Sequence, residues 1–441
     1  MKPKYINYVF VAMTMAFLAN AETISFKNFN HHIVYEKNEI GYLQKASQKQ
    51  VTIAHRLIIK TSTKYNKKKI LKLHSAITEV KELYHGKDFT YFLAEINKDI
   101  ALQRVMKKLV KKRAVILVQT DILQKSEKSH DDDKDHKKAR LNNRLKKPKQ
   151  SKLQQDILRK KQLEMSLSRY LRFIGVEKLW EKTKGKGIKI AVIDDGFDLK
   201  HKEFEKLNLA FSYDASDKKL DSSPIQDQET HGTKIAGVLF AKHDATGVEG
   251  IAPEAELIAI RQPDTWTSNT LLSFQMAKLA NADIINCSWN SPQLMQPIAD
   301  VVNDLVKYGR NGKGTAVIFA AGNKGIELKP YSTEASIDSA IVVGASNFLS
   351  KRTLKFSNKG TSVDIMAFGK PVQSTYPNNK YGKFAGTSLS STIVSGITAL
   401  LMSQNPELTM KQLQIDLKNT ISDKKRLNKF NLKSKQNKGN E

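Results

Sequence analysis

Three short segments of the sequence place an aspartate, a histidine and a serine where they suit nucleophilic catalysis. Asp194 follows an apolar run typical of a buried strand, so its carboxylate is expected at the carboxyl edge of a sheet. His231 precedes small residues that let a helix begin close to a sheet, and Ser388 precedes an apolar helix whose first N–H groups can stabilise an oxyanion. A serine hydroxyl attacks well only when a base takes its proton, and imidazole titrates in the useful range. Each segment alone also fits an ordinary structural role.

The region that must position these residues alternates short apolar strands with amphipathic helices. This alternation predicts an α/β fold with a doubly wound, mostly parallel sheet. One helix is expected from Ile298 to Gly309, and Thr409 with Gln412 forms a capping-box pattern that opens the last helix. No GxGxxG segment opens a helix after the first strand, so a dinucleotide site is not indicated. The strands are expected at 188–193, 257–260, 284–287, 317–320 and 341–343.

A smaller α+β unit is expected between Val51 and Thr120, before this region. Its pattern runs strand, helix, two strands, helix, strand, the order of a ferredoxin-like domain. Helical spacing of apolar residues predicts that the first helix extends from Ile70 to about Val80. The strands are expected at 57–59, near Val80, at 89–96 and at 114–118.

The ends of the chain carry processing and charge signals. Residues 1–21 show a basic start, an apolar run and Ala19-Asn20-Ala21, which predicts a signal peptide cut after Ala21 and a secreted or periplasmic protein. The apolar run is shorter than the roughly 20 residues of a membrane anchor, and no membrane span is expected in the mature chain. Segments 125–165 and 423–441 are rich in lysine and are expected to be a disordered linker and tail.

The formal net charge of +29 raises the question of a nucleic-acid partner. Residues 181–420 carry only about +2 of this excess, and no zinc-finger spacing or RNA-binding aromatic motif is present. A solvated basic surface is therefore favoured, and binding to an anionic surface stays an alternative. The single cysteine, Cys287, excludes an internal disulfide and is expected to be a core residue.

Three motifs taken together resemble the active-site motifs of the subtilase family of serine proteases. They are IDDG ending at Gly196, HGTKIAG starting at His231 and GTSLS around Ser388. AAGN, which ends at Asn323, resembles the family segment that carries the oxyanion-hole asparagine. The resemblance covers roughly residues 180–416 and implies a secreted serine endopeptidase with Asp194, His231 and Ser388 as its triad.

The resemblance also implies a domain organisation and a set of partners. Residues 22–124 would be an inhibitory propeptide that the enzyme removes itself, and residues 166–422 would be the catalytic domain. The expected partners are protein or peptide substrates and the enzyme's own propeptide. The chemistry requires no cofactor.

Several residues depart from the family pattern. Lys234 stands in place of a second histidine, and Thr392 with Ile393 replaces the usual Pro-His. Ser288, Trp289 and Asn290 stand where the family has a Gly-rich strand along the substrate groove, so these three residues and Asp195 are predicted to bind substrate. Two alternatives stay open: a kexin-like preference for basic residues, and a catalytically impaired binding protein whose groove is obstructed by Trp289 and Asn290.

A structural calcium site is a further expectation from the resemblance. The loop from Lys242 to Val248 matches a calcium-binding loop of the family in length and position. Asp244 and Glu203 would supply carboxylate oxygens, which suit this ion. An ordinary polar turn is the alternative.

Overall fold

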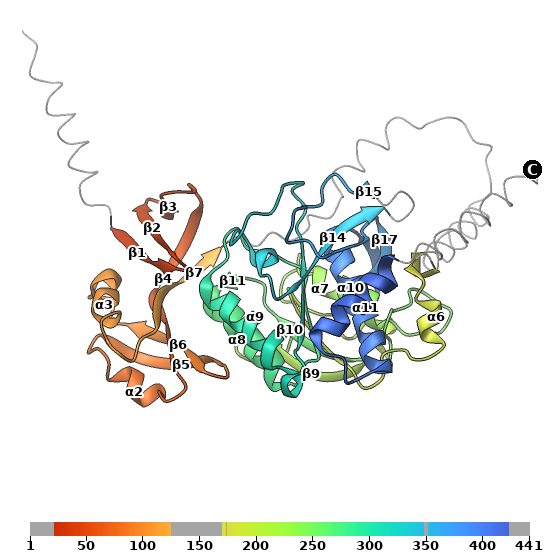
Figure 1. Ribbon diagram of the computed structural model, residues 1–441, viewed down its shortest axis with the longest axis horizontal. Helices are drawn as coiled ribbons and strands as arrows, with labels where there is room; N and C mark the ends of the chain where they lie inside the picture. Colours follow the sequence, from red (N-terminus) through yellow and green to blue (C-terminus); the bar gives the residue numbers. More distant parts are fainter. Residues whose placement is uncertain (1–21, 125–169, 173, 348–351, 423–441) are drawn as a thin grey trace, which may run out of the picture. The chain divides into compact units, whose positions relative to one another are not determined.

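The computed structural model describes residues 22–124, 170–172, 174–347 and 352–422 (Figure 1). The predicted signal segment, linker and tail lie outside these described residues. The described chain forms two compact units. The first holds the chain up to residue 124 together with Thr265–Leu271 and Met295–Pro297, and the second holds the rest.

The first unit is built on an antiparallel sheet. Its order β7-β4-β6-β5, with every neighbour antiparallel, is that of a ferredoxin-like domain, so the predicted topology is confirmed. A short strand, β11 (Thr265–Trp266), pairs with β7 within this unit. The elements are β1 (Thr23–Asn28), β2 (His31–Asn38), β3 (Gly41–Gln44), β4 (Gln50–Ser62), α2 (Lys67–Leu71), β5 (Ile77–His85), β6 (Phe89–Ile96), α3 (Leu102–Leu109) and β7 (Leu117–Gln124).

Three details of this unit differ from the sequence-based expectation. Strands β1 to β3 were not predicted, although Ile24 and Phe26 alternate with exposed positions as a half-buried strand requires. Helix α2 ends at Leu71, and Ile77 and Val80 lie in β5, so the helix predicted through these residues is too long, whereas the strand expected near Val80 is confirmed. The last strand begins at Leu117. Ile70 and Ile77 are seven residues apart, a spacing that fits a helix and also a buried turn that leads into a strand. Residues from Ile77 onward form a strand because they pair with β6.

The second unit is built on a mostly parallel sheet whose first strand in the sequence, β8, lies in its interior. β8 lies between β10 and β12, with β9 beyond β10, and with β13, β14 and β16 beyond β12. These neighbours pair in parallel, which confirms the doubly wound sheet and places Asp194 at its carboxyl edge, where the strand order reverses. The strands are β8 (Lys189–Asp194), β9 (Asn208–Asp214), β10 (Glu256–Arg261), β12 (Ile284–Cys287), β13 (Ala316–Ala320), β14 (Ile341–Asn347), β15 (Arg352–Thr353), β16 (Ile365–Phe368), β17 (Val372–Tyr376) and β18 (Lys380–Phe384).

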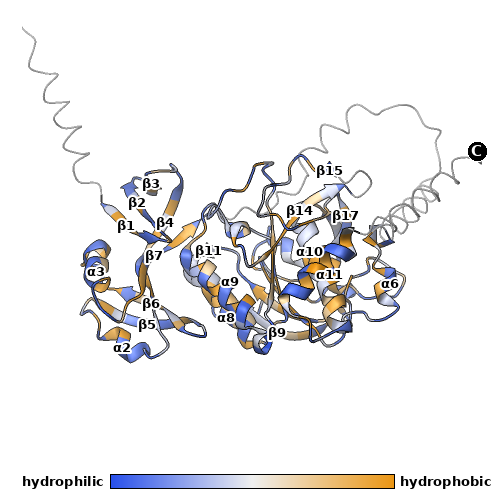
Figure 2. Ribbon diagram, in the orientation of Figure 1, coloured by the Kyte–Doolittle hydropathy of each residue, from blue (hydrophilic) through white to orange (hydrophobic). Residues whose placement is uncertain are grey.

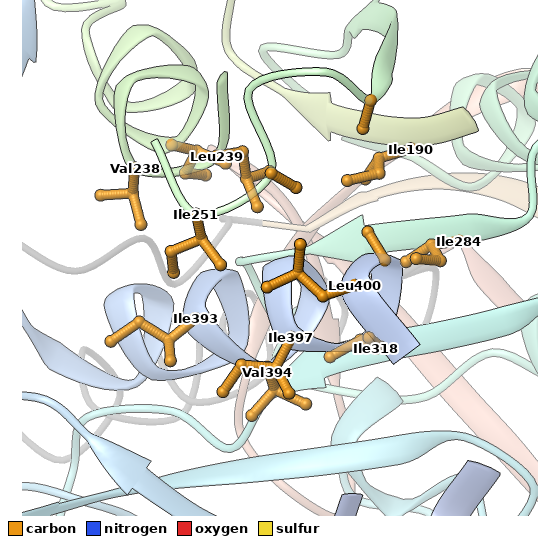
Figure 3. Close-up of a cluster of buried hydrophobic side chains, with 14 of the residues drawn as sticks. Ile190, Val238, Leu239, Ile251, Ile284, Ile318, Ile393, Val394, Ile397 and Leu400 are labelled. Atoms are coloured by element: carbon orange, nitrogen blue, oxygen red, sulfur yellow. The ribbon is translucent and has the colours of Figure 1, made fainter. Parts of the chain in front are cut away.

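Helix α10 runs through the core of this unit. Its side chains pack on the sheet and on α7, and Figure 2 shows its hydrophobic character. Figure 3 shows Ile393, Val394, Ile397 and Leu400 of α10 among buried residues of neighbouring elements, including Ile251, Ile284 and Ile318. A helix buried on most sides must be apolar nearly all round, so its polar residues need internal partners. The helices are α6 (Glu177–Trp180), η1 (Lys202–Phe204), α7 (His231–Phe240), α8 (Thr267–Leu279), α9 (Gln296–Tyr308), η2 (Arg310–Gly312), η3 (Glu334–Ser336), α10 (Gly386–Gln404) and α11 (Met410–Ser422).

The predicted helix ends agree with the structure. α9 ends one residue before Gly309, and Thr409 Oγ1 accepts a hydrogen bond from Gln412 N at 3.4 Å where α11 begins. Among the helices in the described ranges, none combines the length and the apolar character needed to cross a bilayer.

Candidate active site

The catalytic pair predicted from the sequence is formed by a strand end and a helix start. Asp194 ends β8 and is fully buried, and His231 is the first residue of α7. The distances from His231 Nδ1 to Asp194 Oδ1 and Oδ2 are 2.9 and 3.0 Å. A carboxylate accepts, so Nδ1 carries the proton and Nε2 is left as the basic nitrogen. The Phe384 ring packs edge-on against the imidazole, with centroids 5.5 Å apart.

The neighbouring carboxylate, Asp195, holds the start of α7. Its Oδ1 accepts from Gly232 N at 2.8 Å and its Oδ2 from His231 N at 3.3 Å. An acidic group at a helix N-terminus satisfies free N–H groups and complements the helix dipole. A Cβ at residue 232 would lie 2.5 Å from Gly196 O, so only glycine allows this close approach. The buried carboxylate of Asp195 therefore holds the start of α7 at His231, and substrate binding by Asp195 stays a prediction.

A buried ion network, which the sequence did not reveal, lies next to the segment that precedes His231. Arg261 ends β10 in register with Asp194, and its guanidinium binds Glu229 at 2.6 and 3.0 Å and Asp214 at 2.6 Å. Glu229 lies two residues before His231, and all three side chains are at most 5 % exposed. The only signal in the sequence was an arginine at the end of an apolar strand. Removing one partner would leave an uncompensated buried charge, so the network is needed to keep the segment before His231 in place.

Ser388 lies in the first turn of α10 and is 1 % exposed. Its Oγ donates to the backbone oxygen of Ser288 at 3.1 Å. Gly386 opens the helix with a φ of +88°, a conformation that residues with a side chain rarely adopt. The N-cap residue, Ala385, makes no side-chain hydrogen bond to this helix.

Asn323 follows β13 and reaches the start of α10. Its Oδ1 accepts from Thr387 N at 3.0 Å and from Thr387 Oγ1 at 3.1 Å. Because the oxygen end of the amide is occupied by these two donors, the Nδ2 end is the one available to a substrate oxygen. The structure thus brings Asn323 to the residue before Ser388.

The residues predicted to line the substrate groove turn inward. Trp289 is 2 % exposed and its Nε1 donates to Ile193 O at 2.9 Å, while Asn290 is equally buried and its Nδ2 donates to Ala320 O at 2.9 Å. Ser288 is 1 % exposed, and only its backbone oxygen and hydroxyl reach Ser388. Substrate binding by this segment therefore stays a prediction, and these side-chain bonds leave it to the backbone. Carbonyl groups at the ends of parallel strands need donors, and these side chains supply them.

Other residues singled out from the sequence have structural surroundings. Cys287 is fully buried, and burial raises the pKa of its thiol, so the expectation of a core residue is confirmed. Lys234 is buried with its ammonium 5.2 Å from the centroid of the Tyr376 ring. Glu334, not singled out before, is fully buried and accepts from Ser291 N at 2.7 Å, which fixes the segment after β12.

The structure brings Glu203 against the loop that was predicted to bind calcium. Glu203 is 1 % exposed, and burial raises the pKa of its carboxyl. Its Oε1 accepts from the Tyr381 hydroxyl, whereas its Oε2 is buried and has no hydrogen-bond partner within the described ranges. Gly247 of the loop lies so close that a Cβ there would be 1.8 Å from Glu203 Oε1.

Asp244 lies in the same loop but is tied to it locally. Its carboxylate accepts from Thr246 N at 2.9 Å and from Thr246 Oγ1 at 2.7 Å, and the ammonium of Lys242 is 3.2 Å away. In the part of the chain that the structure describes, no cluster of at least three His, Cys, Asp or Glu side chains forms a metal site.

Comparison with known proteins agrees with the geometry. The model of the "Subtilase family" matches residues 185–439. Subtilisin E of Bacillus subtilis (strain 168) is 34% identical over 244 residues, which are 54% of this chain and 61% of that protein. The match therefore spans less than two thirds of that relative.

Two further relatives match a larger share of their own length. Subtilisin of Bacillus pumilus is 34% identical over 244 residues, 54% of this chain and 85% of the relative. The major intracellular serine protease of Bacillus subtilis (strain 168) is 31% identical over 255 residues, 55% of this chain and 77% of the relative. Since the family model matches more than half of the sequence, the chain belongs to the subtilase family.

Proposed function

We propose that the protein is a serine endopeptidase that cleaves peptide bonds through an acyl-enzyme on Ser388. The observation that carries this proposal is the contact of His231 Nδ1 with the buried Asp194 carboxylate at 2.9 Å. That contact sets the tautomer in which Nε2 is the base, and it stabilises the imidazolium that forms when the base is protonated. The experiment that tests it is hydrolysis of an unstructured protein such as casein, lost on substitution of Ser388.

In the proposed mechanism, Ser388 Oγ attacks the carbonyl carbon of the substrate and its proton passes to His231 Nε2. Asn323 Nδ2 and the Ser388 N–H donate to the oxyanion of the tetrahedral intermediate. His231 then protonates the leaving amine, and a water molecule releases the acyl group by the same steps. Asp195 and the Arg261 network hold His231 in place throughout.

The two alternatives that rested on the groove residues lose their support. Trp289 and Asn290 were expected to obstruct the groove, but both side chains pack inward against strand-end carbonyls. The preference for basic substrates rested on Asp195 and Trp289, which are also buried. We therefore favour an active enzyme and assign it no sequence preference.

We further propose that the enzyme is exported as a zymogen and that residues 22–124 are the inhibitory propeptide. Export rests on the signal pattern in residues 1–21 alone, since one relative is named an intracellular protease. The propeptide assignment is supported by the ferredoxin-like unit before the catalytic domain. It is also supported by Asp121, which is fully buried and accepts from Ser268 N at 2.9 Å and from Ser268 Oγ at 2.7 Å.

Maturation is expected to remove residues 22–124 by a cut between Leu123 and Ser166, where the sequence is polar and rich in lysine. N-terminal sequencing of the mature, active enzyme should give a terminus within that segment. The propeptide assignment fails if the fully active enzyme has Glu22 as its only new terminus.

We also propose that Glu203 and Asp244 hold a structural calcium ion. The support is the buried Oε2 of Glu203, which lacks a hydrogen-bond partner within the described ranges, beside a loop that approaches closely through Gly247. Ca²⁺ takes carboxylate and carbonyl oxygens, and a cation here would offset the cost of burying an ionised carboxyl.

Removal of calcium by a chelator is therefore expected to lower the melting temperature. An ion at about 100 times its Kd stabilises a protein by about 2.7 kcal/mol, and each kcal/mol shifts the melting temperature by about 2–4 °C in a domain of this size. Glu203→Gln should melt at the same temperature with and without chelator. Glu205→Gln should keep the full response, because Glu205 is an exposed partner of Lys242. If the unsubstituted protein melts at the same temperature after chelation, the loop is an ordinary polar turn.

A further inference from the structure

The backbone oxygen of Ser388 is surrounded by buried hydroxyl groups that the mechanism above does not use. Thr392 Oγ1 donates to it at 2.7 Å and Ser391 Oγ at 3.0 Å, and Ser288 Oγ lies at 3.4 Å. Ser288, Ser391 and Thr392 are at most 1 % exposed. The oxygen of the residue proposed as nucleophile is therefore held by side chains from α10 and from the segment after β12.

These hydroxyls belong to a chain of hydrogen bonds that begins in β12. Asn286 Nδ2 donates to Ser288 Oγ at 2.9 Å, and Ser288 Oγ is 3.0 Å from Ser391 Oγ. Each hydroxyl has one proton, so the order Asn286, Ser288, Ser391 and then Ser388 O satisfies every donor. Ser395 Oγ, 3.0 Å from Asn286 Oδ1, fixes the start of the chain. Bonds in such a chain polarise one another, which strengthens the last one.

A single bond from a threonine hydroxyl to the backbone oxygen four residues earlier is common in helices and implies no function. Thr398 makes such a bond to Val394 O at 2.7 Å, deeper in the same helix. Ser388 differs because it is bound reciprocally by a second element. Its Oγ donates to Ser288 O at 3.1 Å, while the Ser288 hydroxyl acts on Ser388 O through the Ser391 hydroxyl, which donates to that oxygen at 3.0 Å.

We propose that Thr392, Ser391 and Ser288 are positioning residues for the nucleophile. By holding the Ser388 carbonyl in one direction, they fix the peptide plane after Ser388 and with it the directions of the Ser388 hydroxyl and N–H. A displacement of about 1 Å at a reacting group can cost about 100-fold in rate, so the loss of one of these bonds should slow the reaction measurably. The proposal rests on the proposed function, because it requires Ser388 to be the nucleophile.

The test is the substitution Thr392→Val, which removes the hydroxyl and keeps the volume. We expect kcat to fall about tenfold, KM to change less than about twofold, and the rate of labelling by a fluorophosphonate to fall about tenfold as well. Thr392→Ser, which restores the hydroxyl, should recover kcat to within about twofold. Thr398→Val is the matched control, because it deletes an equally buried hydroxyl with the same kind of bond.

The control should lower the melting temperature about as much as Thr392→Val and leave kcat nearly unchanged. Equal kcat values for the two valine variants would show that Thr392 is only structural and would overturn the inference. If Thr392→Val does not fold, Ser391→Ala removes the other short bond and is judged by the same comparison. An unsubstituted protein that resists the fluorophosphonate contradicts the proposed function itself, whereas a labelled protein with an unaffected Thr392→Val variant contradicts only this inference.

Discussion

Replacement of Ser388 by alanine is expected to abolish casein hydrolysis and to leave the precursor uncut at its propeptide. The variant lacks the oxygen that forms the acyl-enzyme. His231 then has no hydroxyl to deprotonate, and no tetrahedral intermediate forms for Asn323 to stabilise. The expected loss in kcat is about 10⁶-fold. That magnitude is inherited from subtilisin, a relative of this chain, and does not come from the geometry.

A matched control for this variant is Ser390→Ala, which removes a hydroxyl of the same size two residues along α10. The Ser390 hydroxyl bonds to backbone oxygens, among them Phe368 O at 3.0 Å, and makes no contact with Asp194 or His231 in the described structure. This variant should keep casein hydrolysis and its own processing. Gel electrophoresis of purified precursors, expressed without other proteases, separates the two. Normal removal of the propeptide in Ser388→Ala would show that the protein does not process itself.

Replacement of Asn323 by alanine is expected to lower kcat by about 100- to 1000-fold with little change in KM. The range is again the one found for subtilisin. The physical reason is that Thr387 holds the Oδ1 end of the amide, so the Nδ2 end is aimed in advance at charge that develops only in the transition state. Steady-state kinetics on a peptide ester or anilide measures kcat and KM separately.

Lys324→Ala is the control for the same loop, because Lys324 is exposed and adjacent in sequence. It should leave both kinetic constants within about twofold. If Asn323→Ala turns over substrate at an unchanged kcat while it melts normally, the oxyanion must be stabilised by other donors.

The places in the fold of the three residues proposed to be catalytic could be predicted because their signals are local. Asp194, His231 and Ser388 each stand where a strand ends or a helix begins, and apolar runs of buried parallel strands are visible in any window of the sequence. The doubly wound order follows from the alternation of such runs with helices. The long helix predicted after Ile70 was wrong because pairing of β5 with β6 outweighs local periodicity.

The surroundings of the site could not be predicted, because they depend on partners far apart in the sequence. Trp289 has a bulky side chain, and only its bond to Ile193 O shows that it faces the sheet. The sequence around Asp195 resembled that of a specificity residue. Only the hydrogen bond from Gly232 N to its carboxylate shows that Asp195 holds the start of α7. Arg261 and Glu229 are 32 residues apart, and nothing in either segment indicates the other.

The central claim, that Ser388 is an activated nucleophile, is tested most directly by reaction of the purified mature protein with a fluorophosphonate, followed by mass mapping of the labelled peptide. We expect a single adduct on Ser388 that is absent from the Ser388→Ala variant and that forms more slowly when His231 is lost. A folded protein that stays unlabelled, or that carries the label on another residue, would contradict it.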